Sequence, residues 1–342
     1  MKPSSKNDAQ DRQKLLQDWL NALPGYAFSD VVSASADASF RRYFRSADKN
    51  SGKSYVIMDA PPDKEDCEPF IRIAKMLRSA GVNAPEIIEQ DLSQGFLLLT
   101  DLGDQQYLSH LNERHAETLY SDAVSALIHM QNIKPEAMSE LPVYDDQRLR
   151  DEMALFEQWY LNRHLDLPLT DQQKTTLVAT FDLLIRSALE QPQTFVHRDY
   201  HSRNLMLLQK QNPGVIDFQD AVIGPCTYDL VSLFKDCYIE WPREKIEQWL
   251  EDYLYKSGLI HEAHVEREQF IKWFDFMGVQ RHLKVLGIFA RLNYRDGKEN
   301  YLNDLPLTLK YVVDACARYD ELKPLQQLLE QTVLNHAKVT QA

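Results

Sequence analysis

The sequence contains few cysteines, and none of them forms a recognisable pair. Cys67, Cys226, Cys237 and Cys316 are far apart and show no C-x-x-C spacing. Zinc sites and the disulfide frameworks of small secreted proteins are built from closely spaced cysteines. The spacing therefore disfavours both kinds of site and fits a protein of the reducing cytosol.

Long apolar segments are also missing. No run of the sequence approaches the ~18 apolar residues that a transmembrane helix requires. The first residues, MKPSSKNDAQDRQ, are polar where a secretory signal would have an apolar core. We therefore expect a soluble, cytoplasmic protein that is not bound to a membrane.

Basic residues are outnumbered by acidic ones. The chain has 38 Lys and Arg against 51 Asp and Glu, which gives a net charge of -13, and it contains no long basic run. Proteins that bind nucleic acids or anionic lipids without sequence readout use clustered positive charge. We expect no nucleic-acid partner. Small-molecule or protein partners remain, and no protein partner is indicated.

The hydrophobic pattern predicts an α+β chain. An amphipathic helix at 13–23 precedes strand-like alternation between Val31 and Thr100, which contains a turn at 48–52 between two strands. Within this region residues 61–82 follow a helical pattern. These features predict a small antiparallel sheet accompanied by helices.

The rest of the chain has a different periodicity. From Tyr107 onward the apolar spacing is helical, except for the strand-like LMLL and GVID. With 342 residues, 44% of them hydrophobic, the chain can bury one large two-lobed core or two ordinary ones. We expect a nucleotide-binding lobe at 1–103 and a mostly helical lobe at 104–342.

The stretch HRDYHSRN, residues 197–204, has the spacing H-R-D-x-x-x-x-N. Phosphoryl transfer needs a carboxylate that orients the attacking hydroxyl and accepts its proton, together with oxygen ligands for magnesium. Asp199 is the candidate base, and Asn204 is a candidate magnesium ligand. The following NLMLL, QKQNPG and VIDF predict a short hairpin that returns Asp217 to Asn204 as the second ligand. The alternative is a polar loop without chemistry.

Further polar residues lie in or beside this loop. His197 is expected to be structural, and Arg198 either braces the loop or is solvated. His201 and Arg203 occupy positions at which kinases place a cation against the transferred phosphate. Arg203, together with Asp220 just after the hairpin, is a candidate substrate-binding residue.

HRDYHSRN, IDFQD and GPCTYDLVSLFKD together resemble the aminoglycoside phosphotransferase and choline kinase family, and the resemblance covers nearly the whole chain. It implies a two-lobed protein-kinase-like fold, with ATP as the phosphoryl donor and Mg2+ as the metal. Gly224 and Pro225 are then expected to turn the chain, and Asp229 to open and cap a helix. No segment ending in A-P-E separates Asp217 from that helix, which argues against a protein kinase.

A narrower resemblance rests on dispersed stretches, among them ASADASFRRYFR, VIMDAPPDKEDCEPF, QWYLNRHL and QRHLKVLGIFARLNYRDGK. They are similar to stretches of the bacterial kinases that phosphorylate the anomeric hydroxyl of N-acetylmuramate and N-acetylglucosamine in cell-wall recycling. This resemblance implies an amino sugar as the acceptor and a sugar 1-phosphate as the product. Two alternatives stay open. One is a kinase of another hydroxyl acceptor (an aminoglycoside, a choline-like amine or a hydroxy-amino acid), and the other is a nucleotide-binding scaffold without catalysis.

The chain departs from kinases in its phosphate-binding loop. Kinases carry a glycine-rich loop over the phosphates, whereas the corresponding SASADASF contains no glycine. Its small residues, including Ser35, Ala36 and Ser39, would still let backbone N–H groups approach phosphate oxygens. The alternative is an ordinary β-turn.

A second departure concerns the strand lysine of kinases, whose position here reads Met58 or Asp59. In FRRYFR, alternation places Arg42 on one face of a strand and Arg41 and Arg45 on the other. Arg42 is the expected replacement cation, and an exposed strand arginine is the alternative. The acids at 65–68 either pair with such an arginine or complement a helix dipole, which is the favoured interpretation. At the presumed hinge, backbone groups near Asp101 and Gly103 would hold adenine.

The acceptor side is predicted from a basic helical face. Arg281, Lys284 and Arg291 share roughly one side of a helix in an acidic protein. Arg281 and Arg291 are candidate substrate-binding residues that would suit the lactyl carboxylate of N-acetylmuramate. The alternative is a solvated charged face on a surface helix.

Overall fold

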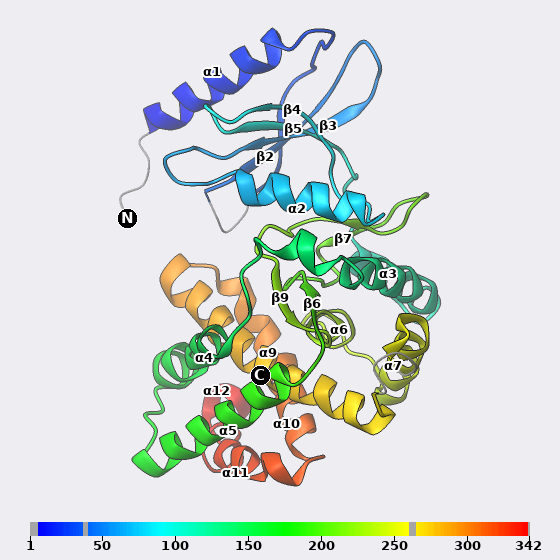
Figure 1. Ribbon diagram of the computed structural model, residues 1–342. Helices are drawn as coiled ribbons and strands as arrows, with labels where there is room; N and C mark the ends of the chain where they lie inside the picture. Colours follow the sequence, from blue (N-terminus) through cyan, green and yellow to red (C-terminus); the bar gives the residue numbers. More distant parts are fainter. Residues whose placement is uncertain (1–5, 37–39, 260–264, 341–342) are drawn as a thin grey trace. The chain divides into compact units, whose positions relative to one another are not determined.

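The computed structural model describes residues 6–36, 40–259 and 265–340 (Figure 1). The chain forms two compact units. The first contains residues 1–105 and 206–219, and the second contains residues 106–205 and 220–342. That the first unit binds the nucleotide stays a prediction.

An antiparallel sheet of five strands forms the first unit, in the order β1-β2-β3-β5-β4. The predicted antiparallel sheet is therefore confirmed. In the turn between β2 and β3, the Asp48 carboxylate accepts the N–H groups of Asn50 and Ser51 at 3.2 and 3.1 Å. The strands are β1 (Val32–Ala36), β2 (Arg42–Ala47), β3 (Ser54–Asp59), β4 (Ile87–Asp91) and β5 (Phe96–Thr100).

Two helices accompany this sheet, with α1 (Lys6–Ala22) above it and α2 (Glu68–Ser79) below it in Figure 1. The expected helix at 61–82 is shorter at both ends. Pro69 occupies one of the first helical positions, where its missing N–H costs nothing, and Gly81 follows the helix with a φ of 82°. The core under α1 contains Leu16, Trp19, Leu20, Ile57, Phe96 and Leu98.

The predicted hairpin after the 197–204 loop is present as β7 (Leu205–Met206) and β8 (Gly214–Val215). Residues 206–219 belong to the first unit because their contacts are there. The Val215 N–H donates to the carbonyl of Asn83 at 2.8 Å. The rings of Phe218 and Phe70 lie 4.9 Å apart.

The second unit is mostly helical, as predicted. It also contains short 3-10 helices, η1 (Tyr107–Ser109), η2 (Pro135–Met138), η4 (Glu299–Asp304) and η5 (Asp320–Leu322), and a π-helix, η3 (Phe156–Leu165). Its α-helices are α3 (Ala116–Gln131), α4 (Asp146–Leu155), α5 (Asp171–Leu189), α6 (Tyr228–Phe234), α7 (Arg243–Ser257), α9 (Arg267–Asp296), α10 (Leu305–Cys316), α11 (Lys323–Gln331) and α12 (Ala337–Thr340).

The core of the second unit is built around α9. This helix packs against α4, α5, α6, α10 and η3, and nearly all of its residues from Phe270 to Ala290 are buried. Gly287 permits the contact with α4, because a Cβ there would lie 2.3 Å from the carbonyl carbon of Leu155. A helix that was expected to present a charged face is therefore enclosed by its neighbours.

A two-stranded antiparallel sheet, β6 (Gln193–Val196) with β9 (Val222–Pro225), leads into the 197–204 loop. The expectation that Gly224 and Pro225 turn the chain is wrong. Both residues continue β9, where Gly224 is paired with Thr194. The chain turns only at residues 226–227, immediately before α6.

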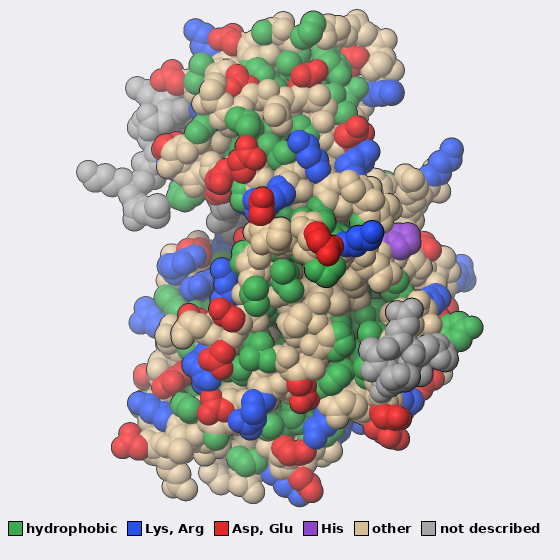
Figure 2. Space-filling model, viewed as in Figure 1, with side chains coloured by type: hydrophobic (Ala, Val, Ile, Leu, Met, Phe, Trp, Pro, Cys, Tyr) green, Lys and Arg blue, Asp and Glu red, His purple; other side chains and the backbone are tan. Residues whose placement is uncertain are grey.

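The surface agrees with the charge pattern of the sequence. On the face that Figure 2 shows, acidic and basic side chains are interspersed among the described residues, and no extended basic area is visible. Each of the described helices is too short or too polar to cross a membrane. The four cysteines are unpaired thiols buried in the structure.

Candidate active site

The start of the 197–204 loop is fixed by a buried carboxylate. Asp229, in the first turn of α6, accepts the backbone N–H groups of His197 and Arg198 at 2.7 and 3.0 Å. Burial raises the pKa of this carboxyl to about 7. The expected capping of its own helix by Asp229 is not observed, because the side chain points to the loop instead.

The loop is closed on itself by hydrogen bonds around Asp199. The Asp199 carbonyl accepts both the His201 N–H and the Asn204 side-chain amide at 3.0 Å. The Asp199 N–H donates to Nδ1 of His197 at 3.3 Å, which gives this buried histidine the structural role that was expected. Asp199 and Asn204 are thereby held in one tight turn.

The far side of the loop is anchored to the second unit by other buried groups. The Tyr200 hydroxyl donates to the Ala123 carbonyl at 2.8 Å. The Ser202 N–H donates to the Asp236 carboxylate at 3.0 Å. These anchors leave Asp199 half-buried at the surface of a rigid loop.

The Asp199 carboxylate lies in a positive field. Burial alone would raise its pKa, but Lys284, Arg281 and Arg198 together hold the pKa below its usual value. A half-buried carboxylate kept ionised in this way can accept a hydrogen bond, and then a proton, from a hydroxyl group. The geometry suits the role expected of Asp199, which remains a proposal.

Arg198 braces the loop rather than being solvated. Its guanidinium forms an ion pair with Glu152 of α4. Glu152 also lies 3.0 Å from Nζ of Lys284 on α9 and accepts the hydroxyl of Tyr144. Nothing in the sequence pattern had indicated Glu152.

Of the basic residues on the helical face predicted to bind the acceptor, Arg281 and Lys284 lie near the 197–204 loop and Arg291 does not. Arg281 and Lys284 are only 4% and 7% exposed, so a solvated charged face is wrong for them. Arg281 contacts the Cys237 sulfur at 3.9 Å, and its charge acts on Asp199. Arg291 follows Arg281 by about 15 Å along the helix axis, at ~1.5 Å per residue, and the structure does not bring it to this cluster.

The two candidates nearest the loop differ in exposure. The guanidinium of Arg203 stacks on the Tyr238 ring, 3.4 Å from its centroid. Asp220 is exposed, and its backbone carbonyl lies 3.5 Å from the Arg198 guanidinium. Arg203 is thus held by an aromatic platform, whereas the Asp220 side chain projects into solvent.

In the first unit, Arg42 at the start of β2 and Arg41 just before it have different partners. Arg42 pairs with Asp59, a fully buried carboxylate that also binds Arg12 of α1. Arg42 therefore lies on the face that α1 covers. Nε of Arg41 pairs with Glu65 at 3.2 Å, so one of the acids at 65–68 does bind an arginine.

The presumed hinge is held by side chains. The Asp101 carboxylate binds Nε and Nη2 of Arg45 at 2.7 and 3.0 Å and accepts the Gly103 N–H at 2.9 Å. Gly103 has a φ of 82°, a conformation that favours glycine. The Gly103 carbonyl also accepts Nη2 of Arg45 at 2.8 Å. The Asp101 side chain and the Gly103 backbone are thus both committed to shaping the hinge, and the backbone candidates for a ligand are those of residues 101–102.

The remaining nucleotide candidates lie at the end of β1. Ser35 and Ala36 belong to this strand, paired with Tyr43 and Arg42, and not to a loop as expected. The pairing shifts register between Ser33 and Ser35. Ser39 lies outside the described residues.

The candidate magnesium ligands come from different units. Asn204 belongs to the second unit and Asp217 to the first. Asp217 has a φ of 65°, a left-handed backbone unusual for a residue other than glycine, and its carboxylate accepts the Gln219 amide at 2.8 Å. Carboxylate and amide oxygens are hard donors of the kind that Mg2+ prefers, so the residues fit this ion.

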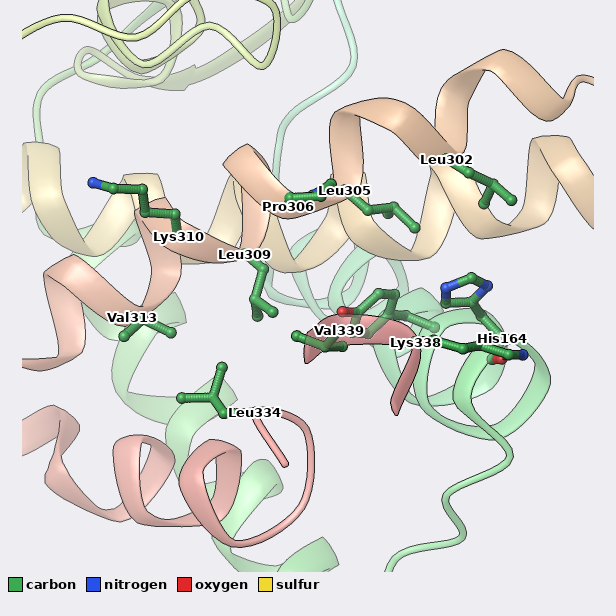
Figure 3. A pocket seen from close by; sticks show the side chains of 11 residues that line it. His164, Leu302, Leu305, Pro306, Leu309, Lys310, Val313, Leu334, Lys338 and Val339 are labelled. Carbon is green, nitrogen blue, oxygen red and sulfur yellow. The ribbon is translucent and has the colours of Figure 1, made fainter. Parts of the chain in front are cut away.

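A cavity of about 550 Å³ in the second unit is separate from these residues. Leucine, valine and proline side chains from η4, α10 and the C-terminal segment surround it, with His164 and Lys338 at one side (Figure 3). None of the predicted site residues lines it. The cavity is therefore not the candidate active site.

A comparison with protein families identifies the family of the chain. The sequence pattern of the phosphotransferase enzyme family matches residues 30–269. The chain belongs to this phosphotransferase family.

Curated relatives of this phosphotransferase are similar over nearly their full length. A protein of Pseudomonas putida is 50% identical over 312 residues, which cover 91% of each chain. A protein of Neisseria meningitidis is 41% identical over 330 residues, 94% of this chain and 96% of the relative. Both relatives are named N-acetylmuramate/N-acetylglucosamine kinase.

Solved structures confirm the two-lobed kinase-like fold of the phosphotransferase. Plasmodium vivax ethanolamine kinase has a TM-score of 0.64 at 12% identity, covering 92% of this chain and 90% of that one. The GDP complex of aminoglycoside 2'-phosphotransferase-IIIa has a TM-score of 0.61 at 14% identity, covering 89% and 99%. At such identities the likeness concerns the fold alone.

Proposed function

We propose that this phosphotransferase is an ATP- and magnesium-dependent kinase of the anomeric hydroxyl of N-acetylmuramate and N-acetylglucosamine. The observation that supports catalysis is the half-buried Asp199, kept ionised by surrounding cations on a loop fixed from both sides. The acceptor is proposed from the names of relatives that are 50% and 41% identical.

In the proposed mechanism, Asp199 orients the anomeric hydroxyl of the sugar and accepts its proton as the oxygen attacks the terminal phosphorus of ATP. The bond from that phosphorus to the β–γ bridging oxygen breaks, and ADP leaves. The Asn204 carboxamide and the Asp217 carboxylate would hold Mg2+. When bound, the metal supplies charge neutralisation at the phosphates. The ordered turn that joins Asp199 to Asn204 fits this division of roles, because it fixes the base relative to one metal ligand.

We propose that the first unit binds the nucleotide on the sheet face that α1 does not cover. In this proposal backbone groups of residues 101–102 hold adenine, since the N–H and carbonyl of Gly103 are bonded to Asp101 and Arg45. The end of β1 at Ser35 and Ala36 faces the phosphates. Arg42 is poorly suited to the phosphates, since it neutralises the buried Asp59 beneath α1. Arg41, paired with Glu65 on the other face, is the better candidate.

We propose Arg281 as the group that favours an acidic acceptor. Its guanidinium is buried, and among the described residues its Nε has no hydrogen-bond partner. A buried cation that lacks a carboxylate partner suits an incoming anion. The carboxylate of N-acetylmuramate has this charge, whereas N-acetylglucosamine would bind without that contribution.

Incubation with MgATP and one acceptor at a time tests the reaction. The acceptors are N-acetylmuramate, N-acetylglucosamine, kanamycin and choline, and phosphorus NMR identifies the product. An anomeric phosphate on either amino sugar is the expected result. Phosphorylation of only kanamycin or choline would contradict the proposed acceptor, and MgATP binding without transfer to any acceptor would indicate a scaffold.

A further inference from the structure

Helix α9 takes part in two buried ion networks. In the first, Asp275 binds Nζ of Lys235 at 2.8 Å and the guanidinium of Arg243 at 2.6 and 3.0 Å, and accepts the Tyr319 hydroxyl at 2.8 Å. This network joins α9 to α6, α7 and residues near the C-terminal helices. None of the hydrogen bonds and ion pairs among these described residues involves the 197–204 loop.

The second network has the same composition but reaches the loop. Its acid is Glu152, its two cations are Lys284 and Arg198, and its hydroxyl comes from Tyr144. The side chains of Glu152 and Lys284 are 16% and 9% exposed. Burying three charged groups in this way rarely gives net stability over apolar packing. Its location next to the candidate base suggests another purpose.

Arg198 is held both at its backbone and at the end of its side chain. Its backbone has a φ of 77°, a conformation that costs energy for a residue other than glycine, and its N–H is held by Asp229. Its guanidinium is held by Glu152. Because Arg198 directly precedes Asp199, any release of either end would change the direction of the Asp199 side chain.

The packing of α4 against α9 sets the position of Glu152. Gly287 lets the end of α4 approach α9 closely, and Glu152 lies one turn before that end. Lys284 lies one turn before Gly287 on α9 and reaches Glu152 at 3.0 Å and the Tyr228 hydroxyl at 3.0 Å. Two rigid helices therefore fix the carboxylate that holds Arg198.

We propose that Glu152, Arg198 and Lys284 act as positioning residues for Asp199, by tying α4 and α9 to the loop that carries it. The proposal rests on the proposed role of Asp199 as the base. Lys284 has a second effect, because its positive charge is the largest of those that favour the ionised form of Asp199. The charged and titratable groups that act on Asp199 are Lys284 and Arg281 of α9, Arg198 and His201 of its own loop, and Asp229 of α6.

The test compares variants of the two networks in the full-length protein, with N-acetylglucosamine and MgATP as substrates. Lys284→Met, Lys284→Arg and Glu152→Gln alter the loop-linked network. Asp275→Asn alters the other network as a matched control. Tyr144→Phe and Tyr319→Phe form a milder matched pair, each removing one hydroxyl, in case the stronger variants do not fold. The readouts are kcat, the KM values and the thermal midpoint.

We expect Glu152→Gln and Lys284→Met to lower kcat by about tenfold or more, as a displaced catalytic group does. Lys284→Arg should restore most of the lost kcat, because it keeps a cation beside Glu152. The KM values should change little in these variants. Asp275→Asn should lower the thermal midpoint and keep kcat close to the wild-type value, and Tyr144→Phe should lower kcat more than Tyr319→Phe does.

The proposal is overturned if folded Lys284→Met and Glu152→Gln proteins keep the wild-type kcat, or if Asp275→Asn lowers kcat equally. Equal losses of kcat in Tyr144→Phe and Tyr319→Phe would also contradict it. Failure of the proposed function is distinguishable from these results. In that case the wild-type protein shows no transfer to the sugar, or Asp199→Asn retains full turnover.

Discussion

The carboxylate of Asp229 accepts the backbone N–H of His197 at 2.7 Å, across 32 positions of sequence. The same carboxylate accepts the next N–H, of Arg198, at 3.0 Å. One buried side chain of α6 thus sets the direction in which the chain leaves β6 and enters the loop of Asp199.

Replacing Asp229 by Asn tests this anchor. The amide offers one oxygen where the carboxylate offers two, and its NH2 group would face a backbone N–H, leaving a buried donor unsatisfied. We expect kcat to fall by about tenfold or more through misplacement of Asp199. Steady-state kinetics measure this effect, and circular dichroism controls for folding. Unchanged kcat in a folded Asp229→Asn protein would show that the anchor does not position the loop.

Arg41, which directly precedes β2, and Arg42, its first residue, should differ in their effect on nucleotide binding. Arg41→Gln should raise the Kd for MgATP by about tenfold, the loss expected for one charge-assisted hydrogen bond of ~1.4 kcal/mol. Arg42→Gln should leave this Kd close to the wild-type value. Calorimetric titration with MgATP measures both constants without any acceptor.

Arg42→Gln should instead lower the thermal midpoint, because the fully buried Asp59 loses one of its two cations. If Arg42→Gln raised the Kd for MgATP and Arg41→Gln did not, Arg42 and not Arg41 would be the cation that binds the phosphates.

Arg281 should discriminate between the two amino sugars. Arg281→Met removes a buried cation that we propose to attract the N-acetylmuramate carboxylate, so the ratio of kcat/KM for N-acetylmuramate to that for N-acetylglucosamine should fall by about tenfold. The ratio isolates recognition, since any effect on Asp199 is common to both acceptors. An unchanged ratio would show that Arg281 does not recognise the N-acetylmuramate carboxylate and acts only through its positive charge near Asp199.

His282 should make stability depend on pH. Its ring is buried, with Nε2 2.9 Å from the Lys235 carbonyl oxygen, and burial lowers its pKa to about 3. The unfolded chain binds a proton near the ordinary histidine pKa of ~6.5. The contribution of His282 is thus fully present above pH ~6.5 and is lost as the pH falls toward 3.

His282→Gln should therefore flatten the decrease of unfolding free energy between about pH 6.5 and 4, as measured by urea denaturation. A slope identical to that of the wild-type protein would show that the neutral ring does not contribute to this decrease.

Much of the fold could be predicted because it depends on local patterns. The β2–β3 hairpin follows from alternation and from a turn in which Asp48 caps the backbone. The hairpin β7–β8 follows from two short apolar runs around a turn-rich segment. The loop of Asp199 and Asn204 was evident from residue type and spacing alone.

Other features depend on contacts that no local pattern records. The basic residues of α9 predicted a substrate-binding face, with a solvated surface helix as the alternative. Neither pattern showed that Lys284 is buried and that its charge is matched by Glu152 from another helix. Strand alternation predicted different sides for Arg41 and Arg42, but the choice between them required knowing that Arg42 pairs with Asp59, which also binds Arg12 of α1. Gly224 and Pro225 suggested a turn, although pairing with β6 keeps them extended.

The most direct test of the account is the turnover of N-acetylglucosamine and N-acetylmuramate by Asp199→Asn beside the wild-type protein, with saturating MgATP. The asparagine keeps the size of the side chain and removes its capacity to accept a proton. We predict formation of sugar 1-phosphate by the wild-type protein and a loss of kcat of about 10²- to 10⁴-fold in the variant, the range for a general base. Turnover by Asp199→Asn within a few-fold of the wild-type value would contradict the assignment of Asp199 as the base.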